Sequence, residues 1–546
     1  MPMNGFLKKL ISLFKTEPVR EEKKEQKTPA APKPTGKTDS LRVRRDVKPS
    51  QAASKPVGKG PAESRNLKKL EVRERQVQMP GSETQFPGAS VDSTAEIIIG
   101  LDFGTCTTKV VIRDRWGGRV YAVPLVKTQK LDSNAYLLPT RLWGHPDGTL
   151  SLHYVKNAKN VSNLKLNFID NADAVIFKDE NTQKELNAYS ATAIYLACVL
   201  QYVRGWFLNN CRAIYSKQTI RWYFNIGLPA VNIEDGALVE KYKKCAMTAW
   251  RLSMEKIPLS MRHAVAVRSG SYHATGNEGI HQDAVNVFPE IASEVVGYAR
   301  SNYREDGMHL LIDIGAGTFD VATFNLIKND GRDTYAFMLT DVQRYGAFVN
   351  CVRRLKHIDT LMMTPGEKAD WGKIRSTCMD ATKSVPQTLS EYMKMIPLAA
   401  ARRRNVADSV RKFESQLEEN VCSIVRTVVG KTKIERDPRS RQWNEGLPVY
   451  LCGGGANLSF YGDVVRSAEE TLKSMGIKKF VVKRLPKPDG FQAKGLVDDQ
   501  FHRLYVAYGL SYSYDEIGKI IPTRDIPDLR ERPVVREIEE ITKDLV

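Results

Sequence analysis

Two short stretches, far apart in the chain, carry the same set of chemically useful residues. Each has an apolar run, an aspartate, a small turn with glycine and threonine, and a second apolar run: IIIGLDFGTCTTKVVI at 97–112 and LLIDIGAGTFDVATFNL at 310–326. Each pattern predicts two strands joined by a turn, with Asp102 or Asp313 ending the first strand. A carboxylate in that place needs a cation or hydrogen-bond donors. The duplication therefore predicts a clamp that holds a metal–nucleotide phosphate tail from two sides.

The turns supply the expected phosphate contacts. Glycine lets the backbone approach a ligand closely, while threonine hydroxyls and neighbouring N–H groups, Thr108 included, can cradle phosphate oxygens. Two facing carboxylates, Asp102 and Asp313, suit Mg²⁺, a hard cation that keeps most of its water and bridges to phosphate. The expected nucleotide contacts are Gly104, Thr105, Cys106, Thr107 and Lys109 in the first turn, and Gly315, Ala316, Gly317 and Thr318 in the second.

A third stretch, VYLCGGGANLSFYGDVV at 449–465, predicts a buried strand, a glycine turn and a helix. Gly453, Gly454 and Gly455 remove side chains where a flat ring or a ribose would lie against the backbone, and Asn457 follows them. Glycines also make ordinary turns, so this motif is weak evidence when taken alone.

The elements that must position these residues alternate between strands and helices. Apolar runs predict strands at 97–101, 109–113, 136–143, 221–230 and 447–455, and helical periodicity predicts helices at 191–209, 347–357, 407–429 and 497–511. This alternation predicts an α/β fold, and the repeated hairpin predicts two related halves.

In this order, DFGTCTTK, DIGAGTFDV and LCGGGAN resemble the motifs of the actin-like ATPase superfamily. DIGAGTFDVATF is most similar to the second phosphate motif of the DnaK-type heat-shock (70-kDa) chaperones. FPEIASEVVGYAR at 288–300 and DDQFHRLYVAYGLSYS at 498–513 resemble the two connecting segments of that family. The resemblance covers residues 95–515.

The resemblance implies a two-lobed fold of duplicated ribonuclease-H-like domains with ATP or ADP and Mg²⁺ between the lobes. Asp102 and Asp313 would hold the metal, largely through water. Glu290 and Asp320 would orient or deprotonate the attacking water, and Lys165 in NLKLNFI would stabilise developing charge. The implied catalytic set is therefore Glu290, Asp320, Lys165 and Asp313.

The chain departs from the chaperone pattern in three places. Ile291 stands where the chaperones have proline, and RYGAFVNCVRRL keeps only Gly346 of a glycine-rich turn. The segment after the second connecting helix is too short for the chaperones' client-binding β-sandwich and lid. We therefore expect a Mg-dependent ATPase that acts as a nucleotide-gated switch on a protein partner or client complex in trans.

Three other functions stay open on the sequence. An actin-like filament or membrane-associated scaffold would use the same nucleotide site, as would an ATP binder without hydrolysis. A small-molecule kinase of the sugar-kinase branch would need an acceptor-site base, for which the sequence offers no clear candidate.

Charge and composition set the expected organisation. The net charge is +19, and residues 1–90 contain 20 Lys and Arg against 10 Asp and Glu, a net of +10. We expect a basic amphipathic helix at 1–14, a disordered Pro-rich linker at 15–94, lobe I at 95–305, lobe II at 306–520 and a charged tail at 521–546.

Residues 5–15 could touch a membrane surface or a partner groove, or form an unstructured end. Nucleic acid is only a weak candidate partner, because the basic linker lacks interleaved aromatic residues. The sequence predicts no transmembrane segment and no signal peptide. The cysteines include no C-x-x-C pair, so we expect no zinc site and a cytoplasmic protein, with peripheral membrane attachment as an alternative.

Overall fold

The computed structural model describes residues 83–126, 135–229, 236–273, 282–329, 331–362, 365–378, 388–396, 400–484 and 487–526. The chain divides into two units, of which Met1–Val72 lies outside these residues and Arg73–Val546 contains everything described below. The helix expected at 1–14, the membrane contact expected at 5–15, the linker as far as residue 82 and the tail from residue 527 also lie outside the described residues.

The first hairpin forms the centre of a seven-stranded sheet with the order β11-β10-β1-β2-β3-β17, in which β4 pairs with β2. β2 and β3 continue from β1 as an antiparallel meander, while β10 and β11 lie parallel to β1 on its other side. The strands are β1 (Ser90–Phe103), β2 (Thr107–Asp114), β3 (Val120–Ala122), β4 (Leu138–Pro139), β10 (Gln218–Leu228), β11 (Val285–Pro289) and β17 (Phe491–Gln492).

The second hairpin forms the centre of a six-stranded sheet with the order β16-β15-β12-β13-β14-β18. β12, β13 and β14 form an antiparallel meander, and β15 and β16 lie parallel to β12 on its other side. The two sheets therefore repeat one topology around the two hairpins. The strands are β12 (Gly307–Ile314), β13 (Phe319–Asn329), β14 (Arg332–Gln343), β15 (Leu447–Cys452), β16 (Phe480–Lys483) and β18 (Lys519–Ile521).

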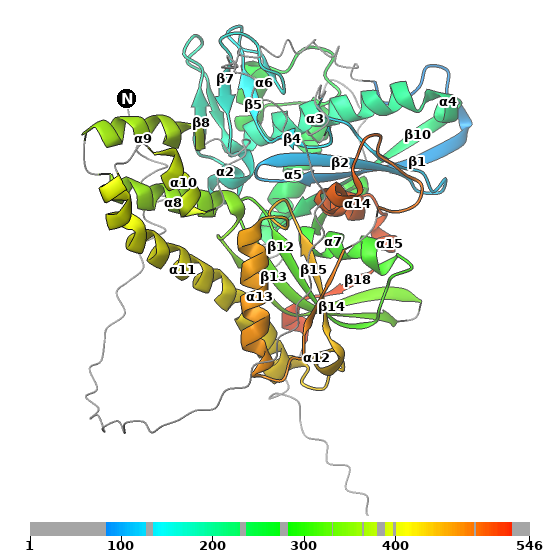
Figure 1. Ribbon diagram of the computed structural model, residues 1–546. Helices are drawn as coiled ribbons and strands as arrows, with labels where there is room; N and C mark the ends of the chain where they lie inside the picture. The colour runs from blue at the N-terminus through cyan, green and yellow to red at the C-terminus, as the bar shows by residue number, and fades with distance from the viewer. Residues whose placement is uncertain are drawn as a thin grey trace, which may run out of the picture. The chain divides into compact units, whose positions relative to one another are not determined.

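Two helices, α7 (Glu290–Ala299) and α14 (Tyr505–Leu510), lie between the sheets (Figure 1). Their buried side chains share one apolar core with strands of both sheets. The helices cross closely at Gly509, where a Cβ atom would lie 1.7 Å from the carbonyl oxygen of Ser293. Only glycine allows this approach, so the crossing depends on a single residue type.

The remaining helices of the first half pack around the first sheet. Among the described helices, α3 alone has the length and hydropathy of a membrane span, but 83% of its apolar window is buried inside the protein. Its apolarity is therefore that of a core helix, consistent with the expected absence of a transmembrane segment. The helices are α2 (Leu164–Asn171), α3 (Ala188–Asn210), α4 (Arg212–Tyr215), α5 (Gly236–Leu252) and α6 (Met261–Arg268). Two small sheets contain β5 (Leu142–Gly144), β6 (Leu150–Ser151) and β7 (Lys159–Val161), and β8 (Val175–Lys178) and β9 (Glu185–Asn187).

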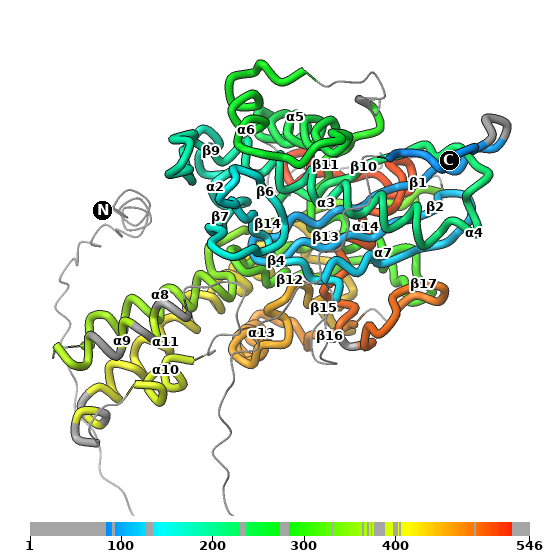
Figure 2. The backbone as a smooth tube through the Cα atoms, turned by 90° about the horizontal axis from the view of Figure 1, so that it is seen from above, coloured from blue at the N-terminus to red at the C-terminus, as the bar shows by residue number. Residues whose placement is uncertain are grey.

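The second half carries a group of helices that lie together, and the C-terminal part of the longest one, α11 (Ala400–Lys431), packs on the second sheet (Figure 2). Leu355, Trp371, Tyr392 and Val406 are among the residues of a small apolar core within this group. Its helices are α8 (Ala347–Leu361), α9 (Pro365–Cys378), α10 (Leu389–Met395) and α11. Against the second sheet lie α12 (Gln442–Glu445) and α13 (Ser459–Lys473), and α15 (Tyr514–Ile517) follows α14.

The expected α/β character is confirmed, but the bounds of several elements and segments differ from those expected. β1 begins at Ser90, before the limit of 94 expected for the linker. The helix expected at 497–511 is a 3₁₀ helix, η4 (Asp498–Leu504), followed by the short α14. Structure also continues into the segment expected as a tail from 521, because Arg436 donates a hydrogen bond of 2.8 Å to the carbonyl of Ile526. Finally, β17 pairs with β3, so this late segment joins the first sheet although the chain around it was expected to form lobe II.

Candidate functional site

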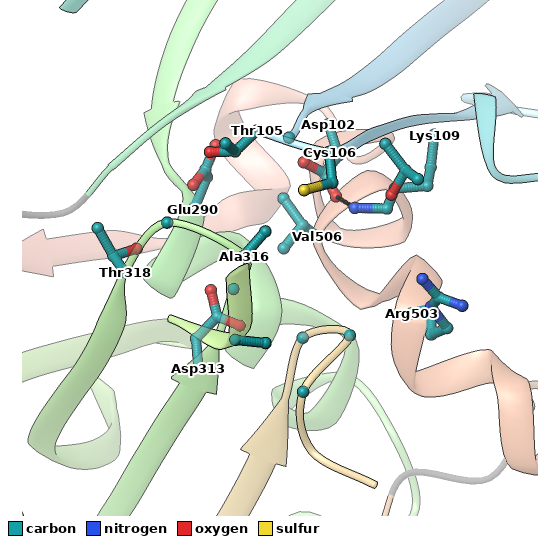
Figure 3. Close-up of a pocket in the computed structure, with 18 of the residues that line it drawn as sticks. Asp102, Thr105, Cys106, Lys109, Glu290, Asp313, Ala316, Thr318, Arg503 and Val506 are labelled. Atoms are coloured by element: carbon teal, nitrogen blue, oxygen red, sulfur yellow. Dashed lines mark hydrogen bonds and ion pairs between the residues drawn. The ribbon is translucent and has the colours of Figure 1, made fainter. Parts of the chain in front are cut away.

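The two turns face each other across a cavity of about 230 Å³ (Figure 3). The predicted turn residues line this pocket: Asp102, Gly104, Thr105, Cys106, Thr107 and Lys109 from the first hairpin, and Asp313, Gly315, Ala316, Gly317 and Thr318 from the second. Lys165, Glu290, Gly453, Gly454 and Gly455 also line it. The fold thus brings together these residues from five separate segments.

Asp102 faces a cation supplied by its own hairpin. Asp102 and Lys109 are opposite each other in the β1–β2 register, and Nζ of Lys109 lies 2.8 Å from Oδ2 of Asp102. Both side chains are largely buried, so the ion pair compensates a carboxylate that would otherwise be costly at the end of an apolar strand. Lys109 therefore does not face solvent. Asp102, which the sequence assigned to metal binding, already has this cation as its partner.

Thr108 does not belong to the phosphate cradle that the sequence predicted. Because side chains alternate along a strand, Thr107 and Lys109 face the pocket while Thr108 points into the core. Thr108 is fully buried, and its Oγ1 lies 3.0 Å from Oγ1 of Thr140 and 2.8 Å from the hydroxyl of Tyr195.

Lys165 and Glu290 form a buried ion pair at the pocket wall. Lys165 lies in the first turn of α2 and Glu290 begins α7, yet Nζ of Lys165 is 2.6 Å from Oε1 of Glu290. Burial raises the pKa of Glu290, and the charge of Lys165 opposes that rise. Burial lowers the pKa of Lys165, but the charges of Glu290 and Asp102 outweigh it, so the pKa of Lys165 is raised. The lysine thus stays charged inside the pocket.

The second turn is held by the N-terminus of α8. The carbonyl oxygens of Gly315, Ala316 and Gly317 accept hydrogen bonds from the N–H groups of Ala347 (2.9 Å), Phe348 (3.0 Å) and Gly346 (3.3 Å). A trans peptide directs its C=O and N–H groups in opposite directions. The N–H groups that follow these carbonyls, from Ala316 to Thr318, therefore point away from α8. The start of α8 therefore holds the second turn in place.

Three carboxylates lie on the side of the second hairpin: Asp320 and Glu294 are buried, and Asp313 is partly buried. Asp313 and Asp320 are opposite each other in the β12–β13 register, and Oδ1 of each has no hydrogen-bond partner among the described residues. Asp320 lies behind Asp313 and is not part of the pocket lining. Burial raises the pKa of Asp313 to about 7, with the charges of Glu290 and Asp102 adding to the effect. Burial and the charge of Asp313 likewise raise the pKa of Asp320.

The third carboxylate, Glu294, was missed by the sequence reasoning. It lies one helical turn after Glu290 on α7, is 2% exposed, and neither carboxylate oxygen has a partner among the described residues. Burial, followed by the charges of Asp313 and Asp320, raises the pKa of Glu294 well above its ordinary value. The spacing E-x-x-x-E was a usable signal, because residues four apart lie on one face of a helix.

This donor set fits a divalent cation that keeps much of its water. The unpartnered Oδ1 of Asp313 can bind a cation or one of its water ligands. Across the described part of the chain, no group of three or more His, Cys, Asp and Glu residues is arranged to hold a metal ion directly. Mg²⁺ suits such a site, since it is often held by one or two carboxylates together with phosphate.

The glycine turn after β15 borders Asp313. Gly453 has a φ of 77°, and a Cβ there would lie 2.2 Å from Oδ1 of Asp313, so both backbone and space require glycine. Asn457 lies outside the pocket lining, where its Nδ2 is 3.5 Å from Nε2 of His502. His502, Arg503 and Val506 line the pocket from η4 and α14, and the sequence reasoning missed them, as it did Ala347 and Phe348.

Comparison with known proteins adds no family to this description. No protein-family model matches the chain, and no curated protein matches its sequence.

Proposed function

We propose that this chain is a DnaK-like member of the actin-like ATPases, which binds ATP with Mg²⁺ and hydrolyses it to ADP and phosphate. The repeated sheet topology, with one Asp-Gly-Thr hairpin at the centre of each sheet, supports the two-lobed fold. The observation that carries the proposal is the convergence of both turns, the glycine turn and the Lys165–Glu290 pair on one pocket.

Each part of the pocket has a place in phosphoryl transfer. The N–H groups of the two turns would bind phosphate oxygens, and Lys165 would stabilise charge that develops on the transferred group. Glu290 would accept the proton of the attacking water, since its carboxylate lies in the pocket beside Lys165. When bound beside Asp313, Mg²⁺ would neutralise phosphate charge. Asp320, opposite Asp313 on the neighbouring strand but outside the pocket lining, would add negative charge near the bound cation.

The position of α7 and α14 supports a switch. Both helices share one apolar core with strands of both sheets, and Glu290 begins α7 while Val506 of α14 lines the pocket. A change at the phosphates would therefore reach the helices that join the two halves. We propose that a protein partner in the cytoplasm reads this change.

Site-directed variants of the pocket carboxylates test the proposal. We expect Glu290→Gln to lower kcat for ATP hydrolysis about 100-fold while ADP binding persists, because the variant removes the proton acceptor. Asp313→Asn should weaken binding of ADP in the presence of Mg²⁺ and leave the weaker binding in EDTA unchanged. The matched controls are Glu470→Gln and Asp463→Asn, whose side chains are 70% and 52% exposed on α13.

Wild-type protein that binds neither ATP nor ADP in calorimetry would overturn the proposed function. Equal ATPase rates in wild type and in both pocket variants would show that the hydrolytic site lies elsewhere.

A further inference from the structure

Thr140, which directly follows β4, holds the first turn at two points. The N–H group of Thr140 donates to the carbonyl of Cys106 (2.9 Å), and its Oγ1 donates to the carbonyl of Gly104 (2.8 Å). Thr140 is 3% exposed and does not line the pocket. The carbonyls of Gly104 and Cys106 are therefore held from the side of the turn that faces away from the pocket.

The Thr140 hydroxyl is the last member of a directed chain of hydroxyl groups. Because its proton goes to Gly104, the contact of 3.0 Å between Thr140 and Thr108 must be donated by Thr108. Thr108 in turn accepts from the phenol of Tyr195 on α3 at 2.8 Å, while the other acceptor near that phenol, the Pro139 carbonyl, is 3.5 Å away. Tyr195 therefore donates to Thr108, Thr108 donates to Thr140, and Thr140 donates to the Gly104 carbonyl.

All three side chains of the relay are buried, and each hydroxyl proton has a hydrogen-bond acceptor. Tyr195 and Thr108 are completely buried, and burial raises the pKa of Tyr195, so the phenol keeps its proton. Consecutive hydrogen bonds in such surroundings polarise and strengthen one another. A hydroxyl relay of this kind fixes one orientation of the peptide at its end.

The orientation of the carbonyls determines where the N–H groups point. In a trans peptide, the N–H of Thr105 is opposite to the Gly104 carbonyl, and the N–H of Thr107 is opposite to the Cys106 carbonyl. Both N–H groups are therefore turned away from Thr140, and both residues line the pocket. Successive N–H groups directed to one side form an anion-binding concavity.

We propose that Tyr195, Thr108 and Thr140 are positioning residues, which set the N–H groups of Thr105 and Thr107 to bind phosphate oxygens. This inference rests on the proposed function, since it assigns the phosphate part of that site. The second turn has a different anchor, the N-terminus of α8. Damage to the relay should therefore loosen one of the two phosphate-binding turns and leave the other intact.

Binding measurements on relay variants test the proposal, with Mg²⁺ present and with ADP, pyrophosphate and adenosine as probes. We expect Thr140→Val, which removes the hydroxyl and keeps the shape, to weaken ADP and pyrophosphate binding about tenfold. Tyr195→Phe keeps the ring contact with Phe103 and should weaken both by about threefold. Thr140→Ser restores the hydroxyl and should bind within about twofold of wild type. Adenosine, which has no phosphate, should bind all four proteins alike.

A structural role alone would lower adenosine and ADP affinity together, and that result would overturn the relay, as would unchanged ADP binding in Thr140→Val. Amide hydrogen exchange gives a second measurement, because Thr105 and Thr107 should exchange faster in Thr140→Val while Ala316 to Thr318 do not change. The failure of the proposed function looks different: wild type would then bind neither ADP nor pyrophosphate, and the relay proposal would fall with it.

Discussion

At the scale of single residues, the pocket contains more carboxylates than lysines to pair with them. Asp102 and Glu290 each have a lysine partner, Lys109 and Lys165. Glu294 has no partner among the described residues. A buried carboxylate without a partner strongly disfavours its charged form. The nucleotide-free protein therefore holds this group at a cost that rises with pH.

Glu294→Gln should remove that cost. The pKa of Glu294 is raised in the folded state, so its contribution to stability is fully present below its ordinary value of 4.5 and is lost as pH rises through the raised value. At pH 8 the variant should be more stable than wild type by at least about 1.4 kcal/mol, the free energy of a pKa difference of one unit, because glutamine takes up no proton on folding. Thermal unfolding at pH 5 and pH 8 checks this. A variant that is less stable than wild type at pH 8 would show that Glu294 has a stabilising partner.

At the scale of elements, the crossing of α7 and α14 determines how the two halves meet. Gly509→Ala places a methyl group against the Ser293 carbonyl, so the helices must separate or the variant must lose packing. We expect a loss of stability of about 2–3 kcal/mol, as for other overpacked cores. Chemical denaturation measures it. Gly372→Ala, in open space within α9, is the control for the general effect of replacing a helical glycine.

The β12 strand carries a buried histidine that should make the second sheet sensitive to acid. His309 is stacked on Phe324, with ring centroids 5.1 Å apart, and Nδ1 lies 2.7 Å from the Gly307 carbonyl. Burial lowers the pKa of His309 to about 4 from the ordinary value of 6.5. A base with a lowered pKa binds fewer protons when folded, so stability falls as pH falls from about 6.5 to about 4.

That difference in pKa corresponds to about 3 kcal/mol at pH 4. His309→Phe keeps the aromatic stacking and should move the acid-unfolding midpoint to lower pH. His273→Phe, at an exposed position, should leave the midpoint unchanged. Identical acid-unfolding curves for wild type and His309→Phe would contradict the assignment.

Local sequence pattern predicted the parts of the fold that local physics determines. The apolar runs around Asp102 and Asp313 gave both central hairpins, and α8 and β15 begin at the residues where periodicity placed them. Lys165 was expected in the site only from the resemblance, and the structure brings it to Glu290. The rest depends on contacts between distant segments. The pairing of β17 with β3 and the reach of Tyr195 to the first turn have no local sequence signal. The spacing of Glu290 and Glu294 places both on one helix face, but it does not predict that Glu294 is buried without a partner among the described residues.

At the scale of the whole described unit, the pocket is lined by residues of both sheets, so a ligand that fills it should join them. We expect ADP with Mg²⁺ to raise the unfolding temperature. At a ligand concentration 100 times Kd, binding should add about 2.7 kcal/mol to the free energy of unfolding. Calorimetry should show one sharper transition with ligand. An unfolding temperature independent of ADP would contradict a site between the two sheets.

Sedimentation of the protein with ATP and Mg²⁺ distinguishes a switch from a filament. With ATP and Mg²⁺ the protein should stay in the supernatant after ultracentrifugation, as it does without nucleotide. An ATP-dependent pellet containing long polymers would support the scaffold alternative instead.

The pairing of β17 with β3 also concerns how the chain is made. A ribosome releases Val120–Ala122 long before Phe491–Gln492, and α14, which packs on β1 at Gly100, emerges later still. The first sheet must therefore wait for almost the whole polypeptide before its edge and one of its faces are covered. Nascent chains that stop before β17 should expose that edge and bind chaperones. Release of the last described residues should then complete both halves in one late folding step.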